Sequence, residues 1–163
     1  MKERTKEVTH KIMSAVKSRD TKPEVLFRKA LWKWGIHYRK NVKLFGKPDI
    51  AIKKYKLVIF IDGDFWHGNN WRIRNLPSLE SELTNYSNFW KNKILANIER
   101  DKKVNEYYES LHWTVLRFWQ SDIEKDLTAC IVKTIETINR NKIIPTSYAM
   151  DDARRLLDGA KKL

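Results

Sequence analysis

The sequence predicts an α/β fold in which a mixed central sheet is flanked by helices. Helical stretches and short apolar runs follow one another in the order α, β, β, β, α, β, α. The run at 57–61 (LVIFI) is continuously apolar, as expected for a central strand that is buried on both faces. A length of 163 residues fits one ordinary domain with one core.

Apolar spacing and helix-end signals predict the first two helices. Residues 9–18 carry apolar residues at helical spacing, which indicates a short amphipathic helix within an N-terminal arm. Asp20 and Thr21 can cap the next helix, Pro23 suits its first turn, and Gly35 ends it. Its apolar stripe consists of Leu26, Phe27, Ala30, Leu31 and Trp34.

Two short strands and the central strand follow this helix. Residues 36–42 and 50–52 have the apolar pattern of strands, and Gly46 and Pro48 place a tight turn between them. The strand 57–61 comes next.

The second half of the chain begins with a long segment of mixed Gly, Asn, Ser, Pro and Arg at 63–88. This composition predicts a loop, and a loop of this length is more often functional than idle. Apolar spacing then predicts a long helix over 88–110, a strand over 114–118 and a final helix over 123–139. The chain is thus divided into a basic arm (1–20), a folded domain (21–140) and a C-terminal tail (141–163).

The charge balance points to a polyanionic partner. The chain carries 33 Lys and Arg against 20 Asp and Glu, a net charge of +13. Residues 1–50 alone hold 14 basic against 5 acidic side chains, so a nucleic acid should contact this third most. A solvated basic surface without a ligand is the alternative.

Composition also excludes several classes of protein. One cysteine, Cys130, permits neither an intramolecular disulfide nor a zinc site built from several cysteines. No apolar run reaches 18 residues, and the first residues lack the apolar core of a secretory signal. We therefore expect no membrane association and a bacterial cytoplasmic location, close to the nucleoid.

Acidic side chains and a histidine follow the predicted strands. Asp49 follows Pro48, Asp62 ends the central strand, and Asp64 and His67 come directly after it. Strand ends are where an α/β sheet presents groups to a ligand, and paired carboxylates suit a hard ion such as Mg²⁺. Such an ion promotes phosphodiester hydrolysis, and a histidine could move the proton.

Each of these residues also has a purely structural interpretation. Glu24, a further candidate for a water-mediated ion contact, lies where an acid favourably meets the helix dipole. Asp49 and Asp64 could be turn residues, and His67 could be a surface residue. Asp62 is harder to explain structurally, because a carboxylate after a buried strand is costly unless it is paired or metal-bound.

Aromatic residues give a second signal. Several lie on or beside the long loop among basic residues, where they could stack on bases or wedge between them. These are Phe65, Trp66, Trp71 and Trp90. We expect Trp32, Trp34 and Trp113 to fill the core instead.

Together these segments resemble the very short patch repair (Vsr) family of DNA mismatch endonucleases. The resemblance covers about residues 9–124 and rests most on VIFIDGDFWHGNN at 58–70. Further matching segments are TKPEVLFRKAL (21–31), GKPDIAI (46–52), NFWKNKILANIERDKKV (88–104) and HWTVLRFWQSD (112–122). The resemblance implies a type II restriction endonuclease-like core in residues 21–140. It also implies a Mg²⁺-dependent nick 5′ to the T of a T:G mismatch.

The resemblance also assigns roles to individual residues. Asp49 matches the metal-binding aspartate, and the main-chain carbonyl of Ile61 takes the place of the second protein ligand. Asp62 stands where members have histidine or aspartate, so its role is either acid/base or metal binding. His67 resembles the second catalytic histidine. Glu24 matches the helix acid that acts on the ion through water.

The aromatic positions match as well. Phe65, Trp66 and Trp90 fall where the family inserts side chains into the base stack. A further shared block, interpreted as mainly structural, contains Asn97, Arg100 and Asp101. The resemblance implies a monomer on double-stranded DNA, and a mismatch-repair accessory protein would be a further partner.

One departure concerns zinc. Zinc-bearing members have cysteines and histidines where this chain has Asp64, Asn69, Trp71 and Ser121. We therefore expect no structural zinc. The loop would be ordered in another way, through packing of Trp71 or bonding of Asp64 to Arg72 or Arg74.

The leading hypothesis is a Mg²⁺-dependent endonuclease that nicks one strand at a T:G mismatch, through Asp49, Asp62, His67 and Glu24. One alternative keeps the fold and cuts foreign DNA without needing a mismatch. Another is a DNA-binding module without catalysis.

Overall fold

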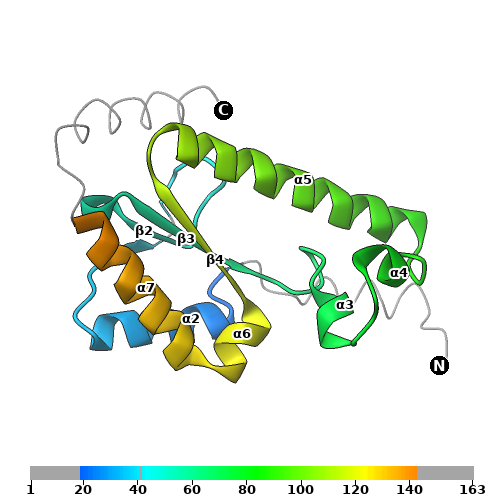
Figure 1. The fold of residues 1–163 in the computed structure, drawn as a ribbon, viewed down its shortest axis with the longest axis horizontal. Coiled ribbons are helices and arrows are strands. Elements are labelled where there is room, and N and C mark those ends of the chain that lie inside the picture. The colour runs from blue at the N-terminus through cyan, green and yellow to red at the C-terminus, as the bar shows by residue number, and fades with distance from the viewer. Residues whose placement is uncertain (1–18, 41, 143–163) are drawn as a thin grey trace.

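The computed structural model describes residues 19–40 and 42–142. The predicted arm and its helix at 9–18, and nearly all of the predicted tail, lie outside these residues. The described elements, labelled as in Figure 1, are α2 (Lys22–Lys33), β1 (Arg39–Lys40), β2 (Ile50–Ile52), the 3₁₀ helix η1 (Lys53–Tyr55), β3 (Leu57–Asp62), α3 (Asn70–Ile73), α4 (Leu79–Leu83), α5 (Asn88–Ser110), β4 (Thr114–Trp119), α6 (Gln120–Lys125) and α7 (Leu127–Lys142).

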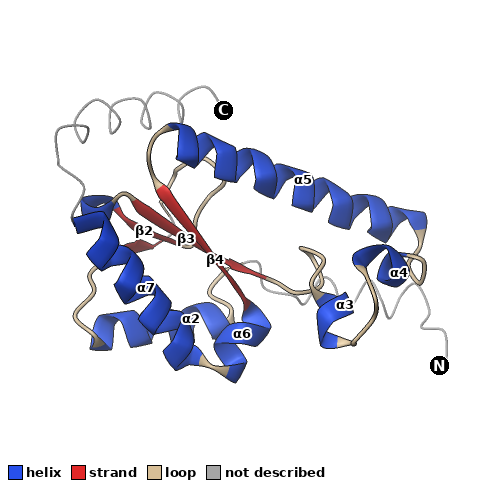
Figure 2. Cartoon of the chain, viewed as in Figure 1, coloured by secondary structure: helices blue, strands red, loops and turns tan. Residues whose placement is uncertain are grey.

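The four strands form one mixed sheet in the order β1, β2, β3, β4. The first three strands are antiparallel neighbours, whereas β3 and β4 run parallel. The long helix α5 covers one face, and α2, α6 and α7 cover the other, as Figure 2 shows by the helices above and below the strands. The predicted α/β architecture with a mixed sheet flanked by helices is confirmed.

The central strand is buried on both faces, as predicted. Leu57, Ile59 and Ile61 point into the core beneath α2, α6 and α7, whereas Val58 and Phe60 point into the core beneath α5. Because side chains alternate along a strand, Asp62 falls on the α5 face of the sheet. The same alternation places Arg117 of β4 on this face, opposite Phe60 in the register.

Gly46 fixes the approach of the turn before β2 to α5. Its φ of +71° suits glycine, and a Cβ at this position would lie 2.6 Å from Cγ1 of Val104. The turn therefore packs directly on α5, close to Asp49.

The structure corrects several element boundaries. The predicted strand 36–42 is reduced to β1, and the segment 63–88 is not all loop, since it contains α3 and α4. The predicted final helix begins earlier, at Gln120, and breaks in two at Asp126. The Asp126 carboxylate accepts a hydrogen bond from the Ala129 amide (2.9 Å), which starts α7 as a separate helix.

Two of the tryptophans assigned to the core are exposed. Trp113 is buried, as predicted, but Trp32 and Trp34 are 60% and 63% exposed. Trp34 follows the last residue of α2, and Trp32 packs edge-on against His37 on the outside of the helix. Near this helix end, the spacing of apolar residues did not show which side of the helix is buried and which is exposed.

None of the helices in the described part of the chain is long and apolar enough to cross a membrane.

Candidate active site

A cleft of about 670 Å³ opens where β3 ends. Its walls come from the N-terminal turn of α2, the turn before β2, the end of β3, the loop that follows, α5 and α6. The cleft brings together five of the candidate residues from the sequence, Glu24, Asp49, Ile61, Asp62 and His67, whereas the candidate Asp64 does not line it. Trp66 also lines it, whereas Phe65 and Trp90 join it through ring contacts with Trp66.

Asp49 is held beside the end of β3 by the register of the sheet. Ile50 pairs with Ile59, so the antiparallel register brings Asp49 opposite Phe60, and the amide of the next residue, Ile61, donates a hydrogen bond to Asp49 Oδ2 (2.7 Å). Burial raises the pKa of Asp49 to about 6, and the charges of Glu24 and Asp62 add to the rise against the opposing Ile61 hydrogen bond. The Asp49 carboxylate is therefore buried close to the negative charges of Glu24 and Asp62, which we call its surplus of negative charge.

Glu24 has a structural task in addition to its place in the cleft. It is 4% exposed, and its carboxylate accepts hydrogen bonds from the Asp20 amide and the Thr21 hydroxyl, each at 2.8 Å. The acid therefore closes the N-terminus of α2, in the manner of a capping box. Thr21 is the N-cap residue, but its side chain donates to Glu24 and does not cap the helix.

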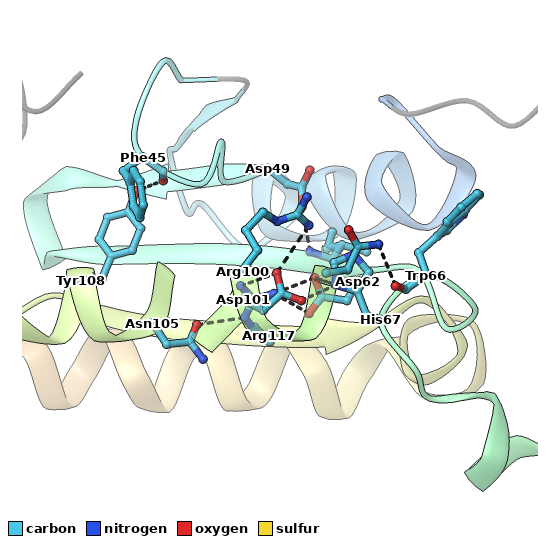
Figure 3. A network of polar contacts seen from close by, with 12 residues as sticks. Phe45, Asp49, Asp62, Trp66, His67, Arg100, Asp101, Asn105, Tyr108 and Arg117 are labelled. Atoms are coloured by element: carbon cyan, nitrogen blue, oxygen red, sulfur yellow. Dashed lines mark hydrogen bonds and ion pairs between the residues drawn. The ribbon is translucent and has the colours of Figure 1, made fainter. Parts of the chain in front are cut away.

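Asp62 is paired with an arginine. Both of its carboxylate oxygens lie 2.8 Å from Nη1 of Arg117 on the neighbouring parallel strand. The pair answers the question raised by the sequence, because a buried carboxylate after an apolar strand needs a partner. Figure 3 shows the two labelled side chains joined by these contacts.

His67 lies between two carboxylates. Its Nδ1 forms a short hydrogen bond with Asp101 Oδ2 and lies 3.7 Å from Asp62 Oδ1. Burial would raise the pKa of Asp101, but the hydrogen bond and charge of His67, and the charges of Arg117 and Arg100, lower it overall. Asp101 is therefore an anion that accepts the Nδ1 proton, which leaves Nε2 of His67 available.

Two oxygen-rich places in the cleft could hold a cation. One is the pair formed by the Asp49 carboxylate and the carbonyl of Ile61. The other is formed by Asp62, His67 and Asp101, whose ligand atoms lie within 4.8 Å of one another. Arg117 forms ion pairs with both carboxylates of the second place, whereas Asp49 forms none with the residues that the structure describes.

The aromatic side chains on the loop form one cluster with those at the start of α5. Phe65, Trp66 and Trp90 contact one another with ring centroids 5.2 to 5.6 Å apart. Tyr86 contacts Phe65, and Phe89 contacts Trp90. The cluster continues the wall of the cleft outward, and Phe89 is its exposed edge (68%).

The loop that carries Phe65 and Trp66 is fastened by Asp64. Asp64 Oδ1 accepts hydrogen bonds from Asn69 Nδ2 (2.7 Å) and Ser121 Oγ (2.6 Å), and Oδ2 accepts one from the Ser121 amide (3.1 Å). The expected partners Arg72 and Arg74 were wrong, because Asp64 turns back toward the start of α6. We call Asp64, Asn69 and Ser121 with these hydrogen bonds the Asp64 clasp. They occupy three of the four positions at which zinc-bearing members have cysteines and histidines.

Basic side chains surround the cleft. Lys22, Lys47, Lys93 and Arg100 line it from α2, the turn before β2 and α5. Their arrangement on different elements suits a ligand that carries several phosphates.

Two residues of the site were missed or undervalued from the sequence. Asp101 was interpreted as mainly structural, but it lies in the cleft against His67. Arg117 was not singled out, although a charge inside an otherwise apolar strand (TVLRF) was a usable signal. In that block, Asn97 does hold the loop, since its amide donates to the Trp66 carbonyl (2.9 Å).

Comparison with known proteins gives consistent matches. The family model described as DNA mismatch endonuclease Vsr matches residues 1–73. The type II nicking enzyme V.NmeDIP of Neisseria meningitidis serogroup C is 42% identical over 135 residues, covering 82% of this chain and 88% of that protein. The type II nicking enzyme V.HpaIIP of Haemophilus parainfluenzae is 46% identical over 124 residues (75% and 84%). The DNA mismatch endonuclease Vsr of Escherichia coli K12 is 33% identical over 111 residues (68% and 67%).

Proposed function

Since this chain belongs to the Vsr family of DNA mismatch endonucleases and is a DNA nicking endonuclease, we propose that it uses Mg²⁺ to nick one strand of a duplex at a T:G mismatch. The observation that carries this proposal is the meeting of Asp49 with the His67–Asp101 pair in one basic cleft.

The Asp49 carboxylate and the Ile61 carbonyl are the residues proposed to hold the ion. Both are hard oxygen donors, which Mg²⁺ prefers. The raised pKa of Asp49 supports this assignment, because a cation would relieve the surplus of negative charge from Glu24 and Asp62. Glu24 would act on the ion through water, since its own oxygens close the start of α2. When bound, the ion would stabilise phosphate charge and lower the pKa of water.

His67 is proposed to move the proton during hydrolysis. Asp101 accepts the Nδ1 proton, so Nε2 has a free lone pair that can take a proton from the attacking water. Water then forms a bond to phosphorus while the bond to the leaving oxygen breaks. Protonation of that oxygen completes the hydrolysis.

Recognition of the mismatch is proposed to depend on the aromatic cluster. Phe65, Trp66 and Trp90 would enter the base stack beside the mismatch, where weaker pairing makes unstacking less costly. The basic rim would hold the phosphates on both sides, and the predicted arm would clamp the duplex. We further propose that the protein acts as a monomer in the bacterial cytoplasm. A mismatch-repair accessory protein would be its second partner.

A nicking assay tests this function. Purified protein would be incubated with matched and T:G duplexes, labelled on either strand, with Mg²⁺ or with EDTA. We expect one nick 5′ to the mismatched T, only with Mg²⁺, and its loss in Asp49→Asn. Glu136→Gln, which removes an exposed carboxylate on α7, serves as the matched control. Equal activity of wild type and Asp49→Asn would contradict the proposal.

The second candidate is a nicking enzyme that needs no mismatch. The loop beside the aromatic cluster supports it, because Asp64, Asn69 and Ser121 build that loop differently from zinc-bearing members. Equal nicking of matched and T:G duplexes would favour this version. The third alternative, a DNA-binding module without catalysis, is dropped because the chain is a DNA nicking endonuclease.

A further inference from the structure

Arg117 joins the two carboxylates that flank His67. Its Nη1 lies 2.8 Å from both oxygens of Asp62, and its Nη2 makes an ion pair with Asp101 Oδ1 at 3.3 Å. Its Nε donates to Asn105 Oδ1 at 3.0 Å. One guanidinium therefore links β3, β4 and α5 at the point where the imidazole lies (Figure 3).

The guanidinium lies in a site built for it. Its carbon is 4.4 Å from the centre of the Phe60 ring, and its side chain is 20% exposed. Asp62 and Asp101 are 7% and 16% exposed, so water does little to stabilise either carboxylate. Pairing with Arg117 offsets the cost of placing two like charges beside one ring.

We propose that Arg117 is a positioning residue for His67: it engages Asp62 so that the Nδ1 proton of the imidazole goes to Asp101 alone. The proposal rests on the function of His67 proposed above. Asp62 then acts as an anchor for the guanidinium, and it is neither a metal ligand nor the base.

The argument begins from the single proton on Nδ1. That nitrogen has two carboxylate neighbours, Asp101 in hydrogen-bond contact and Asp62 at 3.7 Å. If the Nδ1 proton alternated between the two carboxylates, the imidazole ring would rotate, and Nε2 would change its direction. Because both oxygens of Asp62 are taken by Arg117, the competition is settled in favour of Asp101.

The same contacts argue against a metal ion among Asp62, His67 and Asp101. These residues offer atoms within 4.8 Å of one another, but Arg117 contacts both carboxylates. A divalent cation there would face a guanidinium at close range in a poorly hydrated site. Among the described residues Asp49 forms no ion pair, and the charge of Arg28 offsets those of Glu24 and Asp62 only in part, so Asp49 remains the better place for an ion.

The experiment compares single and double variants. Arg117→Met keeps an unbranched side chain that resembles the aliphatic part of arginine and removes the charge, which leaves Asp62 as an unpaired anion beside the ring. We expect the turnover rate at saturating DNA and Mg²⁺ to fall about 100-fold, the scale set by a small misplacement of a reacting group. Duplex affinity measured in EDTA should stay within about twofold, because the charged end of this half-buried residue contacts other protein groups.

The double variant gives the decisive comparison. Asp62→Asn together with Arg117→Met removes the unpaired anion, so we expect it to regain at least about tenfold over Arg117→Met alone. Arg140→Met, on α7 away from the cleft, controls for the change in net charge. Wild-type turnover in Arg117→Met, or a double variant no faster than the single one, would overturn the proposal.

A second readout does not require activity. The ¹⁵N shifts of the His67 ring, assigned with His67→Gln, report which nitrogen carries the proton. We expect protonated Nδ1 in wild type and in the double variant, and a changed pattern in Arg117→Met. Unchanged shifts in folded Arg117→Met would also overturn the inference. Failure of the wild type to nick any duplex would refute the proposed function separately.

Discussion

The Ile61 amide donates a hydrogen bond to Asp49 Oδ2 across 2.7 Å, and the Asp49 pKa still lies near 6. This single hydrogen bond does not compensate for the energetic cost of burying the Asp49 charge next to Glu24 and Asp62. The ionised form of Asp49 therefore costs stability, and this cost follows from the same geometry that makes the carboxylate ready for a cation.

We predict that Asp49→Asn stabilises the metal-free protein while it abolishes nicking. A pKa raised from 3.8 to about 6 means that the penalty is absent below pH 4, grows as the pH rises to 6 and is complete above that. The gain should be at most about 3 kcal/mol at pH 7.5 and near zero at pH 4. Urea unfolding in EDTA at both pH values, with Glu136→Gln as control, measures it. A variant that is less stable than wild type at pH 7.5 would exclude this account.

Trp66→Ala should weaken binding to mismatched DNA more than to matched DNA. Removing the Trp66 ring, which lines the cleft and contacts Phe65 and Trp90, should cost about 1 to 3 kcal/mol for each base it stacks on. The fluorescence of a 2-aminopurine next to the mismatch should also lose its increase on binding. Trp34→Ala removes an exposed ring at the end of α2 and should change neither quantity. An equal loss on both duplexes would argue against wedging.

Removing the Asp64 clasp should loosen the recognition loop. Asp64→Ala breaks three hydrogen bonds of a partly buried carboxylate, so a loss of about 1 to 3 kcal/mol is expected. Hydrogen exchange should speed up over residues 63–69 and at the start of α6. Asp122→Ala, an exposed acid next to Ser121, is the control. Protection that is the same in both variants would show that the loop is ordered by other contacts.

The clasp also leads to a prediction about zinc. Asn69 and Ser121 both donate hydrogen bonds to Asp64, so the loop has a source of order other than a metal. Elemental analysis of protein purified without chelator should find no stoichiometric zinc, and EDTA should leave the melting temperature unchanged. About one zinc per chain would refute the prediction.

DNA binding should weaken steeply with salt. Counterion release predicts a linear fall of log K with log salt concentration, and removing one phosphate contact should reduce the slope by about 1. We expect this for Lys47→Gln and Lys93→Gln, which line the cleft. Lys54→Gln, at the opposite end of β3, should leave the slope unchanged. A flat salt dependence of the wild type would contradict phosphate-dominated binding.

Sequence patterns predicted the elements whose burial is regular. The strand 57–61 and the helix 88–110 were placed nearly as found, because continuous burial and long apolar spacing leave few alternatives. Short elements were missed, since α3 and α4 have only a few residues each and depend on the loop packing around them. Trp32 and Trp34 were misplaced because composition does not show which side of a helix end is covered.

The site was predicted at its strand ends and missed at its long-range partners. Asp49 comes directly before one strand, and Asp62 and His67 come at or just after the end of the next, so their proximity at one edge of the sheet could be inferred. Arg117 lies 55 positions after Asp62, and only the parallel register of β3 and β4 brings the two together. No local pattern could have shown that pairing.

That parallel pairing has a consequence during biosynthesis. β3 gains its parallel neighbour β4 only when residues 114–119 have left the ribosome, after the whole of α5 has been made. A nascent or truncated chain that ends before this point has Asp49 and His67 but no guanidinium between Asp62 and Asp101. On the proposed role of Arg117, such a chain lacks the contact that positions His67, so we expect nicking activity only after β4 has been added.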